Sequence, residues 1–409
     1  MPDAVLPAPQ AASRERISSV EFWRFFFTVM VCLYHLEIYL SVRNKLMPSG
    51  SGAVEFFFIL AGFTIAMSAG KRALTPGAPV SPKRARELAV DYVKKKLKAI
   101  YPPLAAVLLL GLVVYPLLGV KSAAGVQGLP EPGIAGSVAN IEWELLMLVG
   151  TPFGMNNYMA PIVPLWFLTP LLLVGYVYTY AIYRHYEFTV FAAPAVGVLF
   201  YIFFTLNSNM MLDHGVKMGF LNAGAVHAVA EMSFGVAAYT LYERLRDRKF
   251  SRFWVIALSL LEIYAIYRLL ALTFYQPVSL DNFRRIPYII MLILFSFLNV
   301  TYFSRFMNKP FWRGFGRVSL AMYLAHVHLA QAYIQGVALL KEKLLGAYAS
   351  PEMSAWLFFL RDAGNYRGVS MTWKDVLLFT LFTAFAALLI TGATAGVRRA
   401  VRAALSFSS

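Results

Sequence analysis

A cationic side chain and an imidazole share the first apolar stretch of the chain. Arg24 and His35 are eleven residues apart, about three turns of an α-helix, so they project from nearly the same stripe at heights differing by roughly 16 Å. Glu21 precedes Arg24 by three residues and can pair with it. An arginine can bind an anion, and an imidazole can act as a general base or nucleophile. The same pattern is compatible with a structural Glu21–Arg24 pair and a hydrogen-bonded core histidine.

Further ionisable residues interrupt this stretch and later apolar stretches. They are Glu37, Glu55, His227, Glu231, Glu262, Arg268, His326 and His328. A charge at membrane depth is costly, so such residues are functional candidates and are expected to face a bundle interior. His227 and Glu231 are four residues apart, close enough on a helix to hydrogen bond and satisfy each other. Glu55 opens an aromatic run at 56–58, which by itself is more typical of packing than of a site.

Four lysines at positions 94, 95, 96 and 98 precede Tyr101 and Pro102 at the start of another apolar stretch. Such a cluster can bind phosphate groups or anionic lipid, or it can fix the orientation of a span. The sequence has no Gly-rich phosphate loop, no Cys/His zinc spacing and no Gly-x-Ser-x-Gly elbow. Soluble nucleotide chemistry and zinc hydrolysis therefore have no support, and we expect no metal site.

The elements that must position these residues follow from composition. Of 409 residues, 59% are hydrophobic and 14% are charged, against about 25% charged in a soluble domain. This excludes a soluble globular protein and predicts one helical membrane bundle. The net charge of +16 is spread over short segments between apolar runs, which argues for topology rather than for a nucleic-acid partner. The single cysteine, Cys32, excludes an intramolecular disulfide.

We predict an all-α, polytopic membrane bundle of about ten transmembrane helices. The predicted spans are 18–41, 53–69, 98–119, 161–183, 188–206, 222–243, 252–274, 285–305, 315–339 and 374–398. Lys and Arg are concentrated in the connecting segments that lie on the same side of the membrane as the N-terminus. The positive-inside rule therefore predicts that both termini are cytoplasmic, N-in and C-in. The predicted transmembrane domain is then 18–398, with cytoplasmic tails at 1–17 and 399–409. The first tail lacks the pattern of a signal peptide.

Several motifs together resemble the acyltransferase 3 family of bacterial integral-membrane acyltransferases. The matching segments are Glu21, Arg24 and His35; 55–63 (acid, aromatic run, Gly-Phe); Lys95 and Lys98 before Tyr101-Pro102; 164–168 (Pro-Leu-Trp-Phe-Leu); and 319–326 (Ser to Tyr-Leu-x-His). The chain departs from the family pattern at Ala61, where a serine is usual, in its basic pair, which is Lys rather than Arg, and at Thr169-Pro170, where many members have a glutamate. The resemblance covers residues 18 to 398.

The resemblance implies O-acyl transfer, most often of acetyl, from cytosolic acyl-CoA to a hydroxyl of a cell-surface glycan or of another extracytoplasmic or lipid-linked acceptor. It places the protein in the bacterial inner membrane, with acetyl-CoA as a donor substrate rather than a bound cofactor. His35, Arg24 and Glu55 are the predicted catalytic residues, and Lys95, Lys98 and Arg24 the predicted donor contacts. The predicted acceptor-site residues are Glu37, Trp166, His227, Glu231, Tyr323 and His326.

In this interpretation His35 is the general base on the acceptor hydroxyl or a transient acyl carrier. Acceptor specificity is expected to depend on the outer loops 120–160 and 340–373. One competing hypothesis is a transporter or flippase of a lipid-linked sugar that uses the buried acids and histidines as a proton relay. Another is a membrane acyltransferase of the MBOAT type. The transporter hypothesis predicts substrate movement without thioester cleavage.

Overall fold

The computed structural model describes residues 17–39, 45–73, 80–118, 163–206, 217–218, 221–276, 283–347 and 373–407. The predicted outer loops 120–160 and 340–373 lie wholly or mostly outside these residues, as do 1–16 of the predicted N-terminal tail. The described chain is helical apart from a two-residue antiparallel pair, β1 (Lys217–Met218) and β2 (Leu221–Asn222), which precedes α8. Helices satisfy their own backbone hydrogen bonds, which an apolar environment requires.

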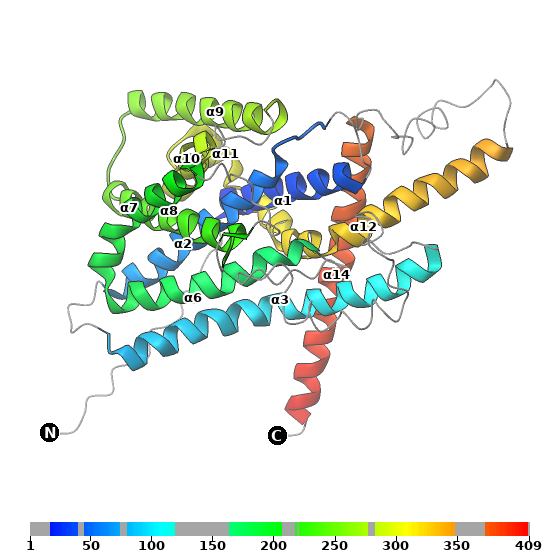
Figure 1. Ribbon diagram of the computed structural model, residues 1–409, viewed down its shortest axis with the longest axis horizontal. Coiled ribbons are helices and arrows are strands. Elements are labelled where there is room, and N and C mark those ends of the chain that lie inside the picture. Colours follow the sequence, from blue (N-terminus) through cyan, green and yellow to red (C-terminus); the bar gives the residue numbers. More distant parts are fainter. Residues whose placement is uncertain are drawn as a thin grey trace.

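Figure 1 shows the helices. They are α1 (Ser18–Tyr39), α2 (Ala53–Ala73), α3 (Pro82–Leu118), α6 (Leu168–Arg184), α7 (Tyr186–Leu206), α8 (Ala223–Leu245), α9 (Arg252–Phe274), α10 (Arg285–Leu298), α11 (Tyr302–Met307), α12 (Phe311–Ala347) and α14 (Trp373–Phe407), with short 3-10 helices η1 (Gly50–Gly52) and η3 (Val163–Phe167).

Five of the described helices contain segments long and apolar enough to cross a membrane. These segments are Ala53–Gly70, Leu165–Arg184, Tyr186–Leu206, Arg252–Phe274 and Trp373–Arg399. The outer surface is also apolar: Phe191 is 85% exposed and Phe253 is 72% exposed. A soluble protein rarely presents such surface, whereas lipid covers it. Each predicted span overlaps a described helix, while the count of ten and the N-in/C-in orientation stay predictions.

Several predicted span boundaries differ from the structure: α12 and α14 run past the predicted ends at 339 and 398, and the differences at α3 and α10 have local causes. Helix α3 begins at Pro82, well before the predicted start at 98, because its charged first half is rich in helix-forming Arg, Lys, Glu and Ala. The predicted continuous span 285–305 is interrupted after α10. Asn299 adopts a left-handed conformation with φ of 52° that ends α10, and Thr301 opens α11 with a capping box. The chain therefore turns at a position where hydropathy alone predicts one continuous helix.

Helices α2 and α8 pack closely through two glycines. A Cβ atom at Gly62 would lie 2.0 Å from the Met232 carbonyl oxygen, and one at Gly235 would lie 2.0 Å from the Ile59 carbonyl oxygen. Small residues that let two backbones approach are typical of membrane helix interfaces. Helix α1 in turn packs against α12. These two pairs, α1–α12 and α2–α8, carry most of the buried ionisable residues.

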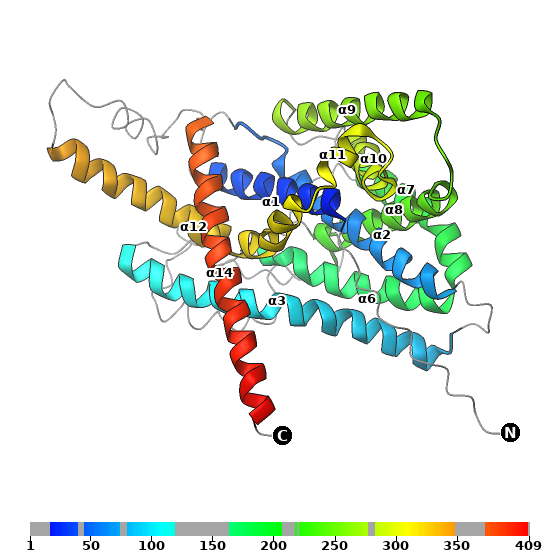
Figure 2. The same cartoon turned by 180° about the vertical axis from the view of Figure 1, so that it is seen from behind.

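The remaining helices enclose these pairs. Helix α3 lies beside α6 and α12, where Tyr92 packs on Gly175 and His328 packs on Gly111. Helix α7 packs on α8, and α9 packs on α10. Both views show α14 running across α3 and α12 rather than alongside them (Figures 1 and 2). The long helix α3 thus forms one wall of the interior.

Candidate functional site

His35 of α1 and His326 of α12 form a contact between the two helices. His35 Nδ1 lies 3.2 Å from His326 Nε2 and 2.9 Å from the Val31 carbonyl oxygen. The other ring nitrogen of His326, Nδ1, lies 2.5 Å from the Tyr323 carbonyl oxygen. His326 is fully buried, while His35 is partly exposed. The sequence predicted both histidines as site residues but could not pair them.

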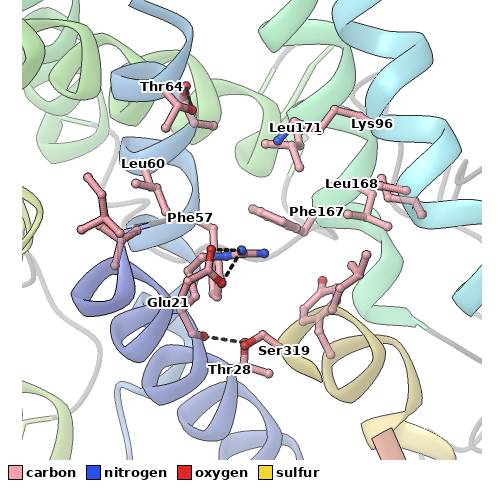
Figure 3. Close-up of a pocket in the computed structure, with 18 of the residues that line it drawn as sticks. Glu21, Thr28, Phe57, Leu60, Thr64, Lys96, Phe167, Leu168, Leu171 and Ser319 are labelled. Carbon is pink, nitrogen blue, oxygen red and sulfur yellow. Dashed lines mark hydrogen bonds and ion pairs between the residues drawn. The ribbon is translucent and has the colours of Figure 1, made fainter. Parts of the chain in front are cut away.

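A cavity of about 430 Å³ lies between α1, α2, α3, α6 and α12, and Tyr323 lines it. Arg24 and Glu21 line the same cavity, with the Arg24 guanidinium donating to both carboxylate oxygens at 2.9 and 3.0 Å. Figure 3 shows Glu21 on α1 and Lys96 on α3 facing the space from opposite sides. The walls between are largely apolar, with Phe57, Leu60 and Phe167 among them. The cavity therefore carries cationic groups beside an apolar passage.

Of the lysines on α3, Lys96 is the one that lines this cavity. Burial and the nearby Arg24 guanidinium lower the pKa of Lys96 to about 8. Sequence reasoning selected Lys95 and Lys98 instead. Lys98 is exposed, and its carbonyl oxygen accepts a hydrogen bond from Arg398. Helical periodicity could have found Lys96, because it precedes Ile100, a buried residue of the same cavity wall, by four residues.

A second cavity of about 330 Å³ adjoins the first and shares Thr64 and Lys96 with it. Lys95 and Arg84 line it from α3, together with Asp91. It therefore extends the cationic lining along the first half of α3. Lys95 thus lines the second cavity and not the first.

Glu55, His227, Glu231 and Arg285 form a buried polar network between α2, α7, α8 and α10, in which two hydrogen-bonded clusters interact electrostatically. The Arg285 guanidinium donates to Glu55 at 2.9 Å and to the Ser49 carbonyl oxygen at 2.8 Å. His227 Nδ1 lies 3.0 Å from Glu231 Oε1, and the Tyr201 hydroxyl donates to the same oxygen at 3.1 Å. Sequence reasoning missed Arg285 because it stands at the first position of a predicted span, where a cation is read as a boundary residue.

This network holds buried polar atoms that find no hydrogen-bond partner in the described part of the chain. They are Glu55 Oε2, His227 Nε2, Glu231 Oε2 and Arg285 Nε. An unsatisfied buried polar atom costs about 1–3 kcal/mol, and ordered water commonly satisfies such groups. Phe204 stacks on the His227 ring with centroids 4.0 Å apart, which closes one side of the network.

The other predicted acceptor-site residues have distinct surroundings. Both Glu37 carboxylate oxygens accept backbone N–H groups, from Leu46 and from Met47, so this side chain anchors the connection that follows α1. Trp166 is buried and packs on Gly224 at the start of α8. The Tyr323 ring lies 5.7 Å from the His326 ring. Of the predicted site residues, the structure therefore brings His35, Tyr323 and His326 together. It also brings Glu55, His227 and Glu231 together, in a second place.

Two ionisable residues without a predicted role have structural contacts. Glu262 is fully buried on α9 and accepts a hydrogen bond from the Thr301 hydroxyl, which also caps α11. His328 packs on Gly111 between α12 and α3. Glu262 thus connects α9 to α11, and His328 connects α12 to α3.

Comparison with known proteins gives one family match. The family described as "Acyltransferase domain", the acyltransferase 3 type, matches residues 17–396, which is nearly the whole chain. No curated protein and no solved structure matches the chain.

Proposed function

Because the chain belongs to the acyltransferase 3 family and is an integral membrane protein, we propose that it is an O-acyltransferase with cytosolic acyl-CoA as donor. In this proposal the transferred acyl group is acetyl. The acceptor is a hydroxyl group of a cell-surface glycan or of a lipid-linked or other extracytoplasmic molecule. The membrane is the bacterial inner membrane, in which cytosolic donor and extracytoplasmic acceptor lie on opposite faces.

One observation carries this proposal: the cavity of about 430 Å³ is lined by Arg24, Lys96 and Tyr323, and the Tyr323 carbonyl contacts the histidine that contacts His35. Acyl-CoA has a polyanionic end and a long, largely uncharged arm that carries the thioester. A cavity with cations in one part and apolar walls elsewhere suits both the anionic end and the uncharged arm of acyl-CoA. Tyr323 therefore lies between this cavity, which neither histidine lines, and the His35–His326 contact, and in the proposal the thioester arm passes Tyr323 to reach His35.

Donor binding in this proposal uses lysine and arginine differently. Lys96 and Lys95 act as point charges on the phosphate groups, since an ammonium lacks the planar fork of a guanidinium. Arg24 is already held by Glu21, so its orientation is set before the donor arrives. Glu21 also keeps the empty cavity closer to neutral, which reduces the cost of holding two cations near each other.

His35 is the only proton carrier that the transfer step requires. As the acceptor hydroxyl attacks the thioester carbonyl carbon, His35 takes the hydroxyl proton. The C–O bond forms, the C–S bond breaks, and the thiolate leaves with the proton that His35 returns. The products are the ester and the free CoA thiol. If His35 carries the acyl group transiently, its ring nitrogen first attacks the thioester carbon, so that a C–N bond forms while the C–S bond breaks and the CoA thiolate leaves. The acceptor hydroxyl then attacks the same carbon, the C–O bond forms while the C–N bond breaks, and the hydroxyl proton ends on the CoA thiolate.

The test is release of free CoA thiol from acetyl-CoA by the detergent-purified protein. Wild type and His35→Ala are compared with and without a crude extract of surface glycan. We expect thiol release that requires both the extract and His35, with His35→Ala showing the same melting temperature as wild type. Substrate movement in vesicles without thiol release would instead support a transporter that uses its buried acids and histidines as a proton relay.

A further inference from the structure

We infer that His326 is a positioning residue that fixes the tautomer and orientation of His35 through the contact between their rings. This inference rests on the proposed function, in which His35 handles the proton of the acceptor hydroxyl. His326 acts through His35 and does not itself touch the reacting atoms. The role differs from direct acceptor binding, which the sequence alone suggested for His326.

The proton positions follow from the groups that face each ring nitrogen. The Tyr323 carbonyl oxygen, 2.5 Å from His326 Nδ1, can only accept a hydrogen bond, so Nδ1 carries the proton. A neutral imidazole then has its lone pair on Nε2. His326 is fully buried, and burial disfavours a charged ring. His326 Nε2 is therefore an acceptor directed at α1.

The same reasoning fixes the proton of His35. Its Nδ1 faces two acceptors, His326 Nε2 at 3.2 Å and the Val31 carbonyl oxygen at 2.9 Å. A lone pair on Nδ1 would oppose both, whereas an N–H there satisfies them as a shared donor. The neutral His35 ring then holds its lone pair on Nε2. This is the nitrogen that can take a proton from an acceptor hydroxyl.

A second group that holds a catalytic imidazole in one tautomer is a recurring solution in proton transfer. Here the second group is a neutral imidazole rather than a carboxylate. A neutral partner orients His35 without adding a charge at membrane depth, which would be costly. When His35 takes a proton, the hydrogen bond to His326 Nε2 strengthens, because the donor is then charged.

Helix α12 keeps this role separate from that of its other buried histidine. Ser319 and Tyr323 line the cavity, and His326 lies one turn beyond Tyr323 on the side of α1. His328 instead packs on Gly111 of α3. The two histidines share a helix, a residue type and full burial, so His328 is a matched control for His326.

The experiment compares His326→Gln, His326→Phe and His328→Gln with wild type in thiol release from acetyl-CoA in the presence of the glycan extract. A glutamine retains an acceptor oxygen and an N–H donor, whereas phenylalanine retains only a ring of similar volume. We expect His326→Phe to lower kcat about 100-fold with an unchanged KM for acetyl-CoA. His326→Gln should recover most of this loss, and His328→Gln should keep the wild-type kcat.

A second measurement reads the tautomer without any need for activity. ¹⁵N-histidine NMR of the protein in lipid, with His35 assigned from the His35→Ala spectrum, should show His35 protonated at Nδ1 in wild type and a mixture of tautomers in His326→Phe. Wild-type kcat in His326→Phe, or a wild-type His35 spectrum in that variant, would overturn the inference. Absence of thiol release by wild type would count against the proposed function alone, and the NMR comparison would still decide the role of His326.

Discussion

The Glu55 carboxylate of α2 and the Arg285 guanidinium of α10 form an ion pair 2.9 Å long in which the side chains are only 4% and 3% exposed. Arg285 also holds the Ser49 carbonyl oxygen, and its guanidinium occupies the space that a side chain at Gly52 would need. The pair therefore ties the segment before α2 to α10. Glu55 was predicted as a catalytic residue, and this contact gives it a structural partner as well.

Removing one partner of this pair should destabilise the protein strongly. Arg285→Met leaves Glu55 as an uncompensated buried charge, which typically costs about 3–5 kcal/mol, whereas replacing both partners of a buried pair by apolar residues is often close to neutral. We expect Arg285→Met to lower the Tm in detergent and the double variant Glu55→Leu/Arg285→Met to recover much of the loss. Thermal denaturation of the purified variants measures this.

The activity of the double variant then separates two roles of Glu55. If the carboxylate only neutralises Arg285, thiol release should recover together with the Tm. If Glu55 takes part in the reaction, stability should recover while thiol release stays low. A double variant that is no more stable than Arg285→Met would contradict the ion-pair argument itself.

Lys96 should contribute more to donor binding than Lys98, although both stand in the same lysine cluster. Lys96 lines the cavity with Arg24, while Lys98 is exposed on another face of α3. We expect Lys96→Gln to raise the KM for acetyl-CoA by about tenfold, which corresponds to about 1.4 kcal/mol, with little change in kcat. Lys98→Gln is the matched control and should leave KM within about twofold of wild type. Equal effects of the two substitutions would remove Lys96 from the donor site.

The charge of Lys96 should also make donor binding depend on pH. Burial and Arg24 lower the pKa of Lys96 to about 8, so the ammonium is mostly charged at neutral pH and is lost as the pH rises through that value. Because the donor is an anion, the KM for acetyl-CoA should rise above pH 8. An arginine at this position keeps its charge, so Lys96→Arg should flatten the rise. KM measured on both sides of pH 8 in wild type and Lys96→Arg tests this; parallel curves would exclude Lys96 as the titrating group.

The sequence predicts best what lies on a single helix. Arg24, Glu21 and His35 could be related by helical spacing alone, and the structure keeps Glu21 and Arg24 paired. The His35–His326 contact joins positions that are 291 residues apart, and only tertiary packing brings them together. The family motifs identified both histidines as site residues but did not indicate that the two rings lie close together.

Hydropathy explains the other differences between sequence and structure. It detects apolar length, so it missed the charged first half of α3, which forms helix by backbone propensity. It also joined α10 and α11, because a single left-handed Asn299 and a Thr301 cap barely change the mean hydropathy of a window. Lys96 was missed for a different reason: Lys95 and Lys98 were selected by the family's basic-pair motif, without asking which lysine shares a helix face with the cavity residue Ile100.

The α2–α8 contact should tolerate no side chain at Gly62, whereas α14 offers a glycine that tolerates one. A Cβ at Gly62 would lie 2.0 Å from the Met232 carbonyl oxygen, while a Cβ at Gly392 would meet nothing within 4 Å. Gly62→Ala must push α2 and α8 apart and so loosen the packing on which the Glu55 and His227 contacts depend. Gly392→Ala removes backbone freedom from an exposed helical position and should stabilise α14 by up to about 1 kcal/mol. We therefore expect the same substitution to lower the Tm at one position and to preserve or raise it at the other. Thermal denaturation in detergent compares the two variants directly, and an unchanged Tm for Gly62→Ala would show that α2 and α8 do not pack through their backbones.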